Sequence, residues 1–87
     1  MNLTIDLFGA FRAYSAGAPL NLNVPPGITV SEVKKRIGEA LLSRHSGFDR
    51  HSLVAESALA DEKQVLAEDD VVTRDVSLAL LPPVCGG

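Results

Sequence analysis

With 87 residues, 46% of them hydrophobic and 22% charged, the chain has the length and composition of one globular domain, which typically contains on the order of 100 residues. The net charge of −3 and the lack of a lysine- or arginine-rich block argue against a nucleic-acid-binding protein. A single cysteine, Cys85, excludes an internal disulfide framework. The two histidines, His45 and His51, have no cysteine nearby in sequence, which argues against a closed zinc site.

Membrane and export signals are also missing from the sequence. No stretch approaches the roughly 20 apolar residues of a membrane-spanning helix, and the first residues do not follow the pattern of a secretory signal. We therefore expect a cytoplasmic protein without a membrane or nucleic-acid partner, and without a bound metal or cofactor.

The first two predicted elements are strands. Residues 2–8 alternate between polar and apolar side chains with a period of two, which is typical of a half-buried strand. After a connection that contains turn-forming residues, residues 20–24 alternate between apolar side chains and asparagine, and predict a second strand. Their closeness in sequence favours an antiparallel hairpin.

An amphipathic helix follows the turn at Pro25-Pro26-Gly27. Thr29 and Glu32 have the spacing of a capping box, in which a hydroxyl and a carboxylate satisfy free amides at a helix start. Apolar residues then recur at steps of three and four: Val30, Val33, Ile37, Ala40 and Leu41. The pattern predicts a helix with one face against a sheet, ending before Gly47.

The second half of the chain has a weaker pattern. Residues 46–52 predict a loop, and residues 53–55 a short strand. The acidic segment 58–75 predicts turns with one short strand or helical turn. Residues 76–80 alternate as a last strand, which Pro82-Pro83 ends because proline has no backbone donor.

The order of these elements predicts an α+β fold, with one main helix packed on one face of a mixed sheet. The first and last strands can lie side by side at its centre, as in the β-grasp (ubiquitin-like) fold. We expect a domain over residues 1–81 and a flexible C-terminal tail over residues 82–87.

The tail carries the functional signal. Pro82 and Pro83 favour an extended path, and Val84-Cys85 leads to Gly86 and Gly87. Terminal glycines contribute no packing, but a backbone without Cβ atoms can pass through a narrow channel toward a partner's catalytic groups. The reacting group is then the α-carboxylate of Gly87. The competing interpretation is a frayed chain end with no role.

Three segments together resemble the MoaD/ThiS family of ubiquitin-like sulfur carriers, and most closely the small subunit of molybdopterin synthase. Residues 7–12 (LFGAFR) are similar to the family's first strand and the arginine after it. Residues 26–33 (PGITVSEV) are similar to its helix start, and residues 81–87 (LPPVCGG) to its signature ending. The chain departs from the family at Thr73-Arg74-Asp75, where a Gly-Asp turn is usual, and at Ala55-Glu56-Ser57, where many members have a valine-asparagine turn.

The resemblance implies a sulfur-carrying co-substrate rather than an enzyme. An ATP-dependent adenylyltransferase of the ubiquitin-activating type (MoeB/ThiF-like) would adenylate the Gly87 carboxylate. Attack by a persulfide or sulfide would then give a thiocarboxylate, a 1-thioglycine at Gly87. The accepting partner would be a synthase such as the large subunit of molybdopterin synthase.

Several residues near the tail are ambiguous from sequence. Phe11, Leu59 and Leu81 are candidates for a partner interface, whereas Phe8 is expected in the core. Cys85 is expected to act as a small residue within the partner's channel, since no cation lies near it in sequence to activate its thiol.

Three alternatives remain open from the sequence. The sulfur could serve another pathway: thiazole, thionucleoside, cysteine or homocysteine, or a secondary metabolite. Gly87 could instead be joined to lysines of target proteins, as in a ubiquitin-like modifier. Finally, the chain could be a binding module with an inert tail.

Overall fold

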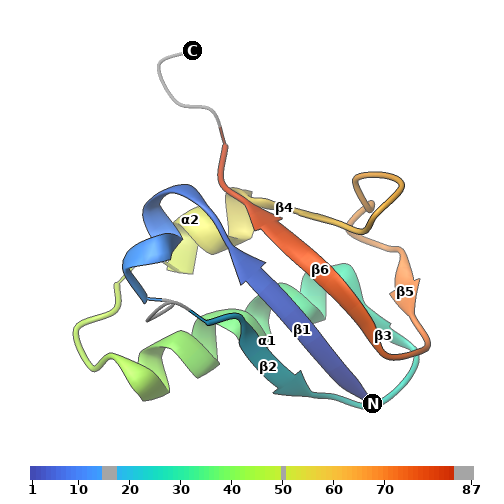
Figure 1. The fold of residues 1–87 in the computed structure, drawn as a ribbon, viewed down its shortest axis with the longest axis horizontal. Helices are drawn as coiled ribbons and strands as arrows, with labels where there is room; N and C mark the ends of the chain where they lie inside the picture. The colour runs from blue at the N-terminus through green and yellow to red at the C-terminus, as the bar shows by residue number, and fades with distance from the viewer. Residues whose placement is uncertain (15–17, 50, 84–87) are drawn as a thin grey trace.

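The computed structural model describes residues 1–14, 18–49 and 51–83. Its elements follow in the order β1 (Asn2–Leu7), the 3₁₀ helix η1 (Gly9–Tyr14), β2 (Leu20–Asn23), β3 (Ile28–Thr29), α1 (Val30–Arg44), α2 (His51–Glu56), β4 (Ala58–Ala60), β5 (Val71–Val72) and β6 (Val76–Leu81) (Figure 1). No helix in these ranges is both long and apolar enough to cross a membrane.

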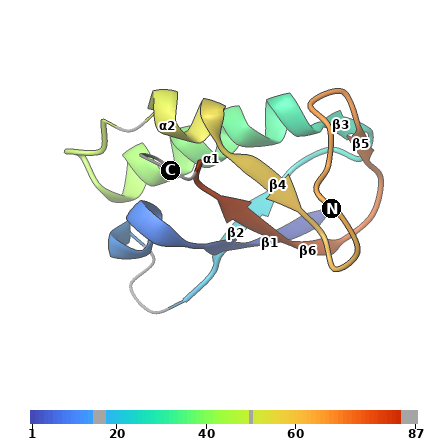
Figure 2. The same ribbon diagram turned by 90° about the horizontal axis from the view of Figure 1, so that it is seen from above.

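The main sheet is mixed, with the strand order β2-β1-β6-β4. The central pair, β1 and β6, is parallel from Leu3↔Val76 to Leu7↔Leu80, whereas β2 and β4 add to its two sides antiparallel. A separate two-stranded pair joins β3 and β5. Figure 2 shows α1 and α2 on the same face of the main sheet. The predicted α+β architecture, hairpin and central pairing of first and last strands are confirmed.

The core lies between the main sheet and α1. The period-two pattern of the strands gives alternate burial, so that Leu3 and Ile5 of β1 and Leu78 and Leu80 of β6 are almost wholly inaccessible. Helix α1 buries the face that the sequence predicted, which includes Val30, Val33, Ile37 and Leu41. Burial of this apolar surface is the main favourable contribution to folding.

Helix α1 begins where the capping pattern placed it. Thr29 is the N-cap residue, and its Oγ1 accepts a hydrogen bond from the Glu32 backbone N–H at 3.2 Å. The Glu32 carboxylate lies 3.8 Å from Arg36 Nε, one turn further along α1. At the other end, the His45 backbone N–H donates to the Leu41 carbonyl, before Gly47 as predicted.

The strand predicted at residues 53–55 is wrong, because this segment lies in helix α2 and the strand is β4 further along. Three residues are too few for a period to distinguish helix from strand. Tertiary contacts decide it: α2 lies so close to α1 that a Cβ added at Gly38 would be 2.8 Å from His51 Nδ1. The Ser57 hydroxyl donates to the Leu53 carbonyl at 2.6 Å as α2 ends.

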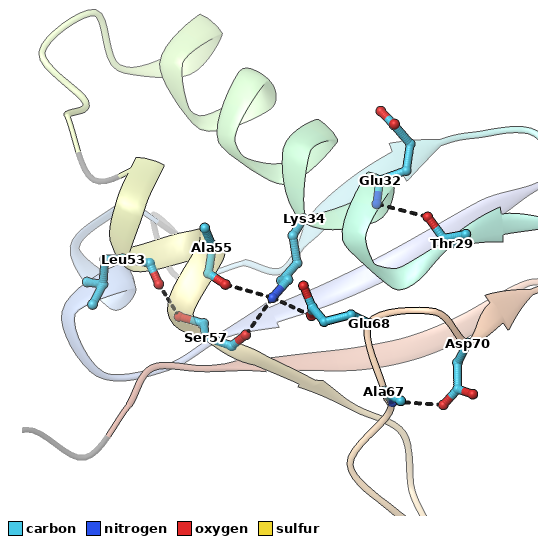
Figure 3. Close-up of polar contacts among 9 residues, drawn as sticks. All are labelled: Thr29, Glu32, Lys34, Leu53, Ala55, Ser57, Ala67, Glu68 and Asp70. Atoms are coloured by element: carbon cyan, nitrogen blue, oxygen red, sulfur yellow. Dashed lines mark hydrogen bonds and ion pairs between the residues drawn. The ribbon is translucent and has the colours of Figure 1, made fainter.

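Lys34 is a buried cation that joins three parts of the fold (Figure 3). It is only 4% exposed, and its Nζ donates to the carbonyls of Ala55 at 2.8 Å and Ser57 at 2.9 Å. The Glu68 carboxylate lies 2.5 Å from the same nitrogen. Lys34 therefore holds α1 against the junction of α2 and β4 and against the segment before β5, which keeps β4 in place beside β6.

We expect Lys34→Met to lower the free energy of unfolding by about 2–4 kcal/mol, because it removes a buried donor from the Ala55 and Ser57 carbonyls. Glu68→Gln should cost less than about 1 kcal/mol, since the Glu68 side chain is 61% exposed and its ion pair is screened by water. Chemical denaturation of both variants measures the difference. Equal losses would show that the ion pair, not the buried hydrogen bonds, is the main contribution.

The free edge of β4 is covered by a turn that Asp61 stabilises. The Leu66 N–H donates to the Leu59 carbonyl at 2.8 Å, which closes the turn against β4. Asp61 Oδ1 accepts hydrogen bonds from the N–H groups of Lys63 and Gln64, each at 2.8 Å. These two bonds, the one from Lys63 first, hold the pKa of the Asp61 carboxyl below its ordinary value of 3.8.

A lowered folded-state pKa predicts the direction of a pH effect. The ionised Asp61 carboxylate contributes stability above 3.8, its ordinary pKa, and this contribution is lost as the pH falls through the lower pKa of the folded state. The stability difference between the wild type and Asp61→Asn should therefore shrink as the pH is lowered below 3.8. Denaturation curves of the two proteins from neutral to acidic pH measure it. A difference that stays constant with pH would contradict this assignment.

Candidate functional site

The predicted reacting group lies outside the described residues. Val84, Cys85, Gly86 and Gly87 are not among them, so the structure gives the surroundings of the tail's first residues and no more. β6 ends at Leu81, and Pro82 and Pro83, both half-buried, follow it.

The sheet topology determines where the tail begins. Because β1 and β6 are parallel, with Leu7 beside Leu80, both strands end at the same edge of the sheet. There β1 continues into η1 (Figure 1). At the same edge, Leu81 pairs with Ala58 at the start of β4. Pro82 cannot donate to a neighbouring strand, so the ladder stops and the chain leaves the sheet. The first tail residues therefore start between η1 and β4.

Pro82 lies directly against the backbone of Gly9. Gly9 has a φ of +59°, in the left-handed region that favours glycine. A Cβ atom added there would be 2.6 Å from Pro82 Cγ, which is closer than a side chain tolerates. The ring of Pro82 therefore fills the space that a side chain at position 9 would need.

Two of the three predicted interface side chains are in the core. Phe11 and Leu59 are both 0% exposed, so the prediction that they offer a surface to a partner is wrong for the described fold. The Phe11 N–H donates to the Phe8 carbonyl at 3.2 Å, and after this tight turn the Phe11 ring is part of the hydrophobic core. Leu59 pairs with Leu80, and both side chains point into the core.

Phe8 shows the opposite error. It was expected in the core but is 44% exposed, because β1 ends at Leu7 and the turn at Gly9 interrupts the alternation. Sequence alternation gave no sign of this, although the glycine directly after Phe8 was a signal that the strand stops there.

A partly exposed apolar surface surrounds the start of the tail. Leu81 and Ala79 alternate with the buried residues of β6 and so face away from the core. Ala58 pairs with Leu81 across β4 and β6 and lies on the same face. We call Phe8, Ala58, Ala79 and Leu81 the tail-side surface. Of the residues predicted for a partner interface, only Leu81 belongs to this surface, and its role in an interface stays a prediction.

A cavity on the helical side of the molecule is not lined by this surface. A cavity of about 360 Å³ lies between α1 and α2, with His51, Val54 and Glu68 among its lining residues. Its buried cation, Lys34, already has three acceptors. Within the ranges that the structure describes, no group of three or more histidine, cysteine, aspartate or glutamate side chains could hold a metal ion.

The burial of Phe11 and the exposure of Phe8, the reverse of what the sequence predicted, can be tested by measuring the stability of variants. We expect Phe11→Ala to cost about 3–5 kcal/mol, the usual loss for a buried phenylalanine. Phe8→Ala should cost less than about 1 kcal/mol, because much of the ring already contacts water. Denaturant unfolding of both variants gives the two values. If Phe8→Ala were the more damaging change, the assignment of the tail-side surface would be wrong.

The sequence matches no protein-family model and no curated protein. Its structure is similar to that of SAMP1 from Haloferax volcanii, with 20% sequence identity, a TM-score of 0.70 and coverage of 100% of both chains. It also resembles a putative molybdopterin converting factor, subunit 1, from Pyrococcus furiosus, with 17% identity and a TM-score of 0.65 over 97% of this chain and 99% of that one.

A second structure from H. volcanii, of small archaeal modifier protein 1, matches with 19% identity and a TM-score of 0.66, covering 95% of this chain and 98% of the other. At such low identities the likeness concerns the fold alone. Together with the mixed sheet and its single long helix, it shows that the chain has the β-grasp, ubiquitin-like fold.

Proposed function

We propose that this chain is a sulfur carrier whose Gly87 carboxylate is adenylated and converted to a thiocarboxylate, and that the sulfur is delivered to molybdopterin synthesis. One observation supports this proposal above the others. The parallel pairing of β1 and β6 starts the tail at the sheet edge, beside the tail-side surface. A partner that binds this surface is therefore in reach of the Gly-Gly ending of the sequence.

The similar structures support the same class of function. One is named as a subunit of a molybdopterin converting factor and the others as small archaeal modifier proteins. Both descriptions are compatible with a small domain that acts through a tail, although a shared fold does not by itself imply a shared function. The choice of molybdopterin as the destination rests on the resemblance of residues 81–87 to the MoaD/ThiS ending.

The chemistry needs only a carboxylate from this chain. A carboxylate oxygen of Gly87 attacks the α-phosphorus of ATP, and pyrophosphate leaves. Hydrosulfide, or a sulfur donor equivalent to it, then attacks the acyl carbon, and AMP leaves with the electrons of the broken C–O bond. The product is a thiocarboxylate, whose sulfur is a better nucleophile than a carboxylate oxygen. Both steps take place in the activating partner, so the chain is a co-substrate.

The residues of the tail fit this use. Pro82 and Pro83 have restricted φ angles, which lowers the conformational entropy lost when the tail is held in a partner. Gly86 and Gly87 have no side chains to obstruct a narrow channel. The partners would be a MoeB/ThiF-like adenylyltransferase and a synthase that accepts the sulfur, such as a molybdopterin synthase large subunit.

Intact mass spectrometry tests the proposal. The protein is incubated with ATP, a sulfide source and the activating enzyme encoded nearest to it. We expect a mass increase equal to the replacement of one oxygen by sulfur, absent from a variant that lacks Gly86 and Gly87. Gly47→Ala is the matched control, because Gly47 is exposed and no atom lies within 4 Å of a Cβ added there. No mass change with a competent activating enzyme would refute the sulfur-carrier function.

A second candidate function is that of a ubiquitin-like protein modifier. The observation that favours it is the likeness to small archaeal modifier protein 1. In that case Gly87 would form an isopeptide bond with lysines of other proteins. Covalent conjugates that appear in cell extract with ATP and disappear on removal of Gly86-Gly87 would favour the modifier, whereas a stable thiocarboxylate on the free protein favours the carrier.

A further inference from the structure

Gly9 occupies a position where two constraints on the backbone meet. It is the first residue of η1, shortly after the central strand β1, and adopts a φ of +59°, which residues with a Cβ atom rarely adopt. A Cβ there would also lie 2.6 Å from Pro82 Cγ and 3.5 Å from Pro82 Cδ. The first constraint is intrinsic to the turn, whereas the second concerns the start of the tail.

Gly27 separates these two constraints. It too has a positive φ, of +87°, but nothing lies within 4 Å of a Cβ added to it. Any side chain at Gly27 is therefore strained by the backbone alone, whereas a side chain at Gly9 must also displace Pro82. The chain thus contains its own control for the effect of the Pro82 contact.

Neither partner in this contact can move away easily. On one side, Leu7 is paired with Leu80 in the centre of the sheet, and the fully buried Phe11 holds η1 in place. On the other side, Pro82 directly follows Leu81, which is paired with Ala58. The ring of Pro82 also fixes its own φ angle. A side chain at Gly9 would therefore change the direction in which the chain leaves β6.

We propose that Gly9 is a positioning residue for the tail. Because it has no side chain, the Pro82 ring rests on its backbone, and this contact sets the direction of the tail relative to Phe8. This inference rests on the proposed function, because the direction of the tail matters only if Gly87 must reach a partner's active site. Phe8 is bonded to Gly9 and belongs to the tail-side surface, so the surface that binds a partner and the start of the tail are held in one arrangement.

The arrangement affects the reaction step rather than binding. A partner that binds the tail-side surface fixes the position of β1 and β6 relative to its own active site. The Gly87 carboxylate then reaches the α-phosphate of ATP only if the tail leaves in the right direction. Small errors in the placement of reacting groups lower rates strongly, by about 100-fold for an error near 1 Å.

The first test compares Gly9→Ala with Gly27→Ala as substrates of the activating enzyme, with pyrophosphate release as the readout. We expect Gly9→Ala to lower kcat by about 10-fold or more while KM stays within about twofold of the wild type. Gly27→Ala should leave both constants unchanged. Unfolding curves confirm that both variants are folded under the assay conditions. Equal kcat values for the two variants would refute the positioning role.

A double-mutant cycle tests whether the effect passes through Pro82. Pro82→Ala removes the Cγ and Cδ atoms that a side chain at Gly9 would meet. In the Pro82→Ala background, we expect Gly9→Ala to cause no further loss of kcat. Losses that multiply independently would show that the two residues are not coupled and would overturn the inference.

A third test needs no activating enzyme. Cys85 is the only cysteine in the sequence, so a nitroxide spin label can be attached to the tail without another substitution. Paramagnetic broadening of the amide signals around the tail-side surface should change in Gly9→Ala and remain as in the wild type in Gly27→Ala. Identical broadening in all three proteins would count against the inference.

The outcomes separate the two proposals. If wild-type protein is not adenylated by a competent activating enzyme, the proposed function fails, and the spin-label experiment still decides whether Gly9 sets the tail's direction. If the wild type is adenylated and Gly9→Ala reacts as fast as Gly27→Ala, the proposed function stands and the positioning role fails.

Discussion

The parallel pairing of β1 with β6 is the constraint on which the rest of the structure depends. It joins the two ends of the described chain in the centre of the sheet, from Leu3↔Val76 to Leu7↔Leu80. Parallel neighbours need a long crossover, and α1 lies within that crossover and covers one face of the sheet. The same pairing brings the start of the tail beside η1. The strand pairing that builds the core therefore also determines where the C-terminal tail starts.

Polar interactions on the β4 side of the sheet help to hold this central pair in place. The amine of Lys34 joins α1 to the carbonyls of Ala55 and Ser57, where α2 gives way to β4. β4 in turn pairs with β6 next to the tail. Lys34 is thus linked to the candidate site through β4 and β6, and it keeps this edge of the sheet in place. The turn at Asp61 protects the outer side of the same strand.

The candidate site combines a surface, a direction and a reactive end. Phe8 and Leu81 belong to the surface, and the contact between Gly9 and Pro82 gives the direction. The proposed reactive end, Gly87, is known from the sequence alone. In our proposal a partner recognises the tail-side surface, depends on the direction of the tail and modifies Gly87. Such a division would let a small domain act as a co-substrate, as proposed above.

The sequence alone determined the elements whose patterns are long and regular: the alternating strands β1, β2 and β6, the helix α1 with its Thr29 cap, and the Gly-Gly ending. Their periodicity is local, so neighbouring residues suffice to predict it. Only the tertiary structure decided that residues 53–55 are helical, that Phe11 is buried while Phe8 is exposed, and that Pro82 lies on Gly9. The helix at residues 53–55 and the contact between Gly9 and Pro82 depend on residues far apart in sequence, about which a local pattern carries no information. The exchange between Phe8 and Phe11 follows from the turn at Gly9, where the glycine marks the end of the strand but not which of the two rings is buried.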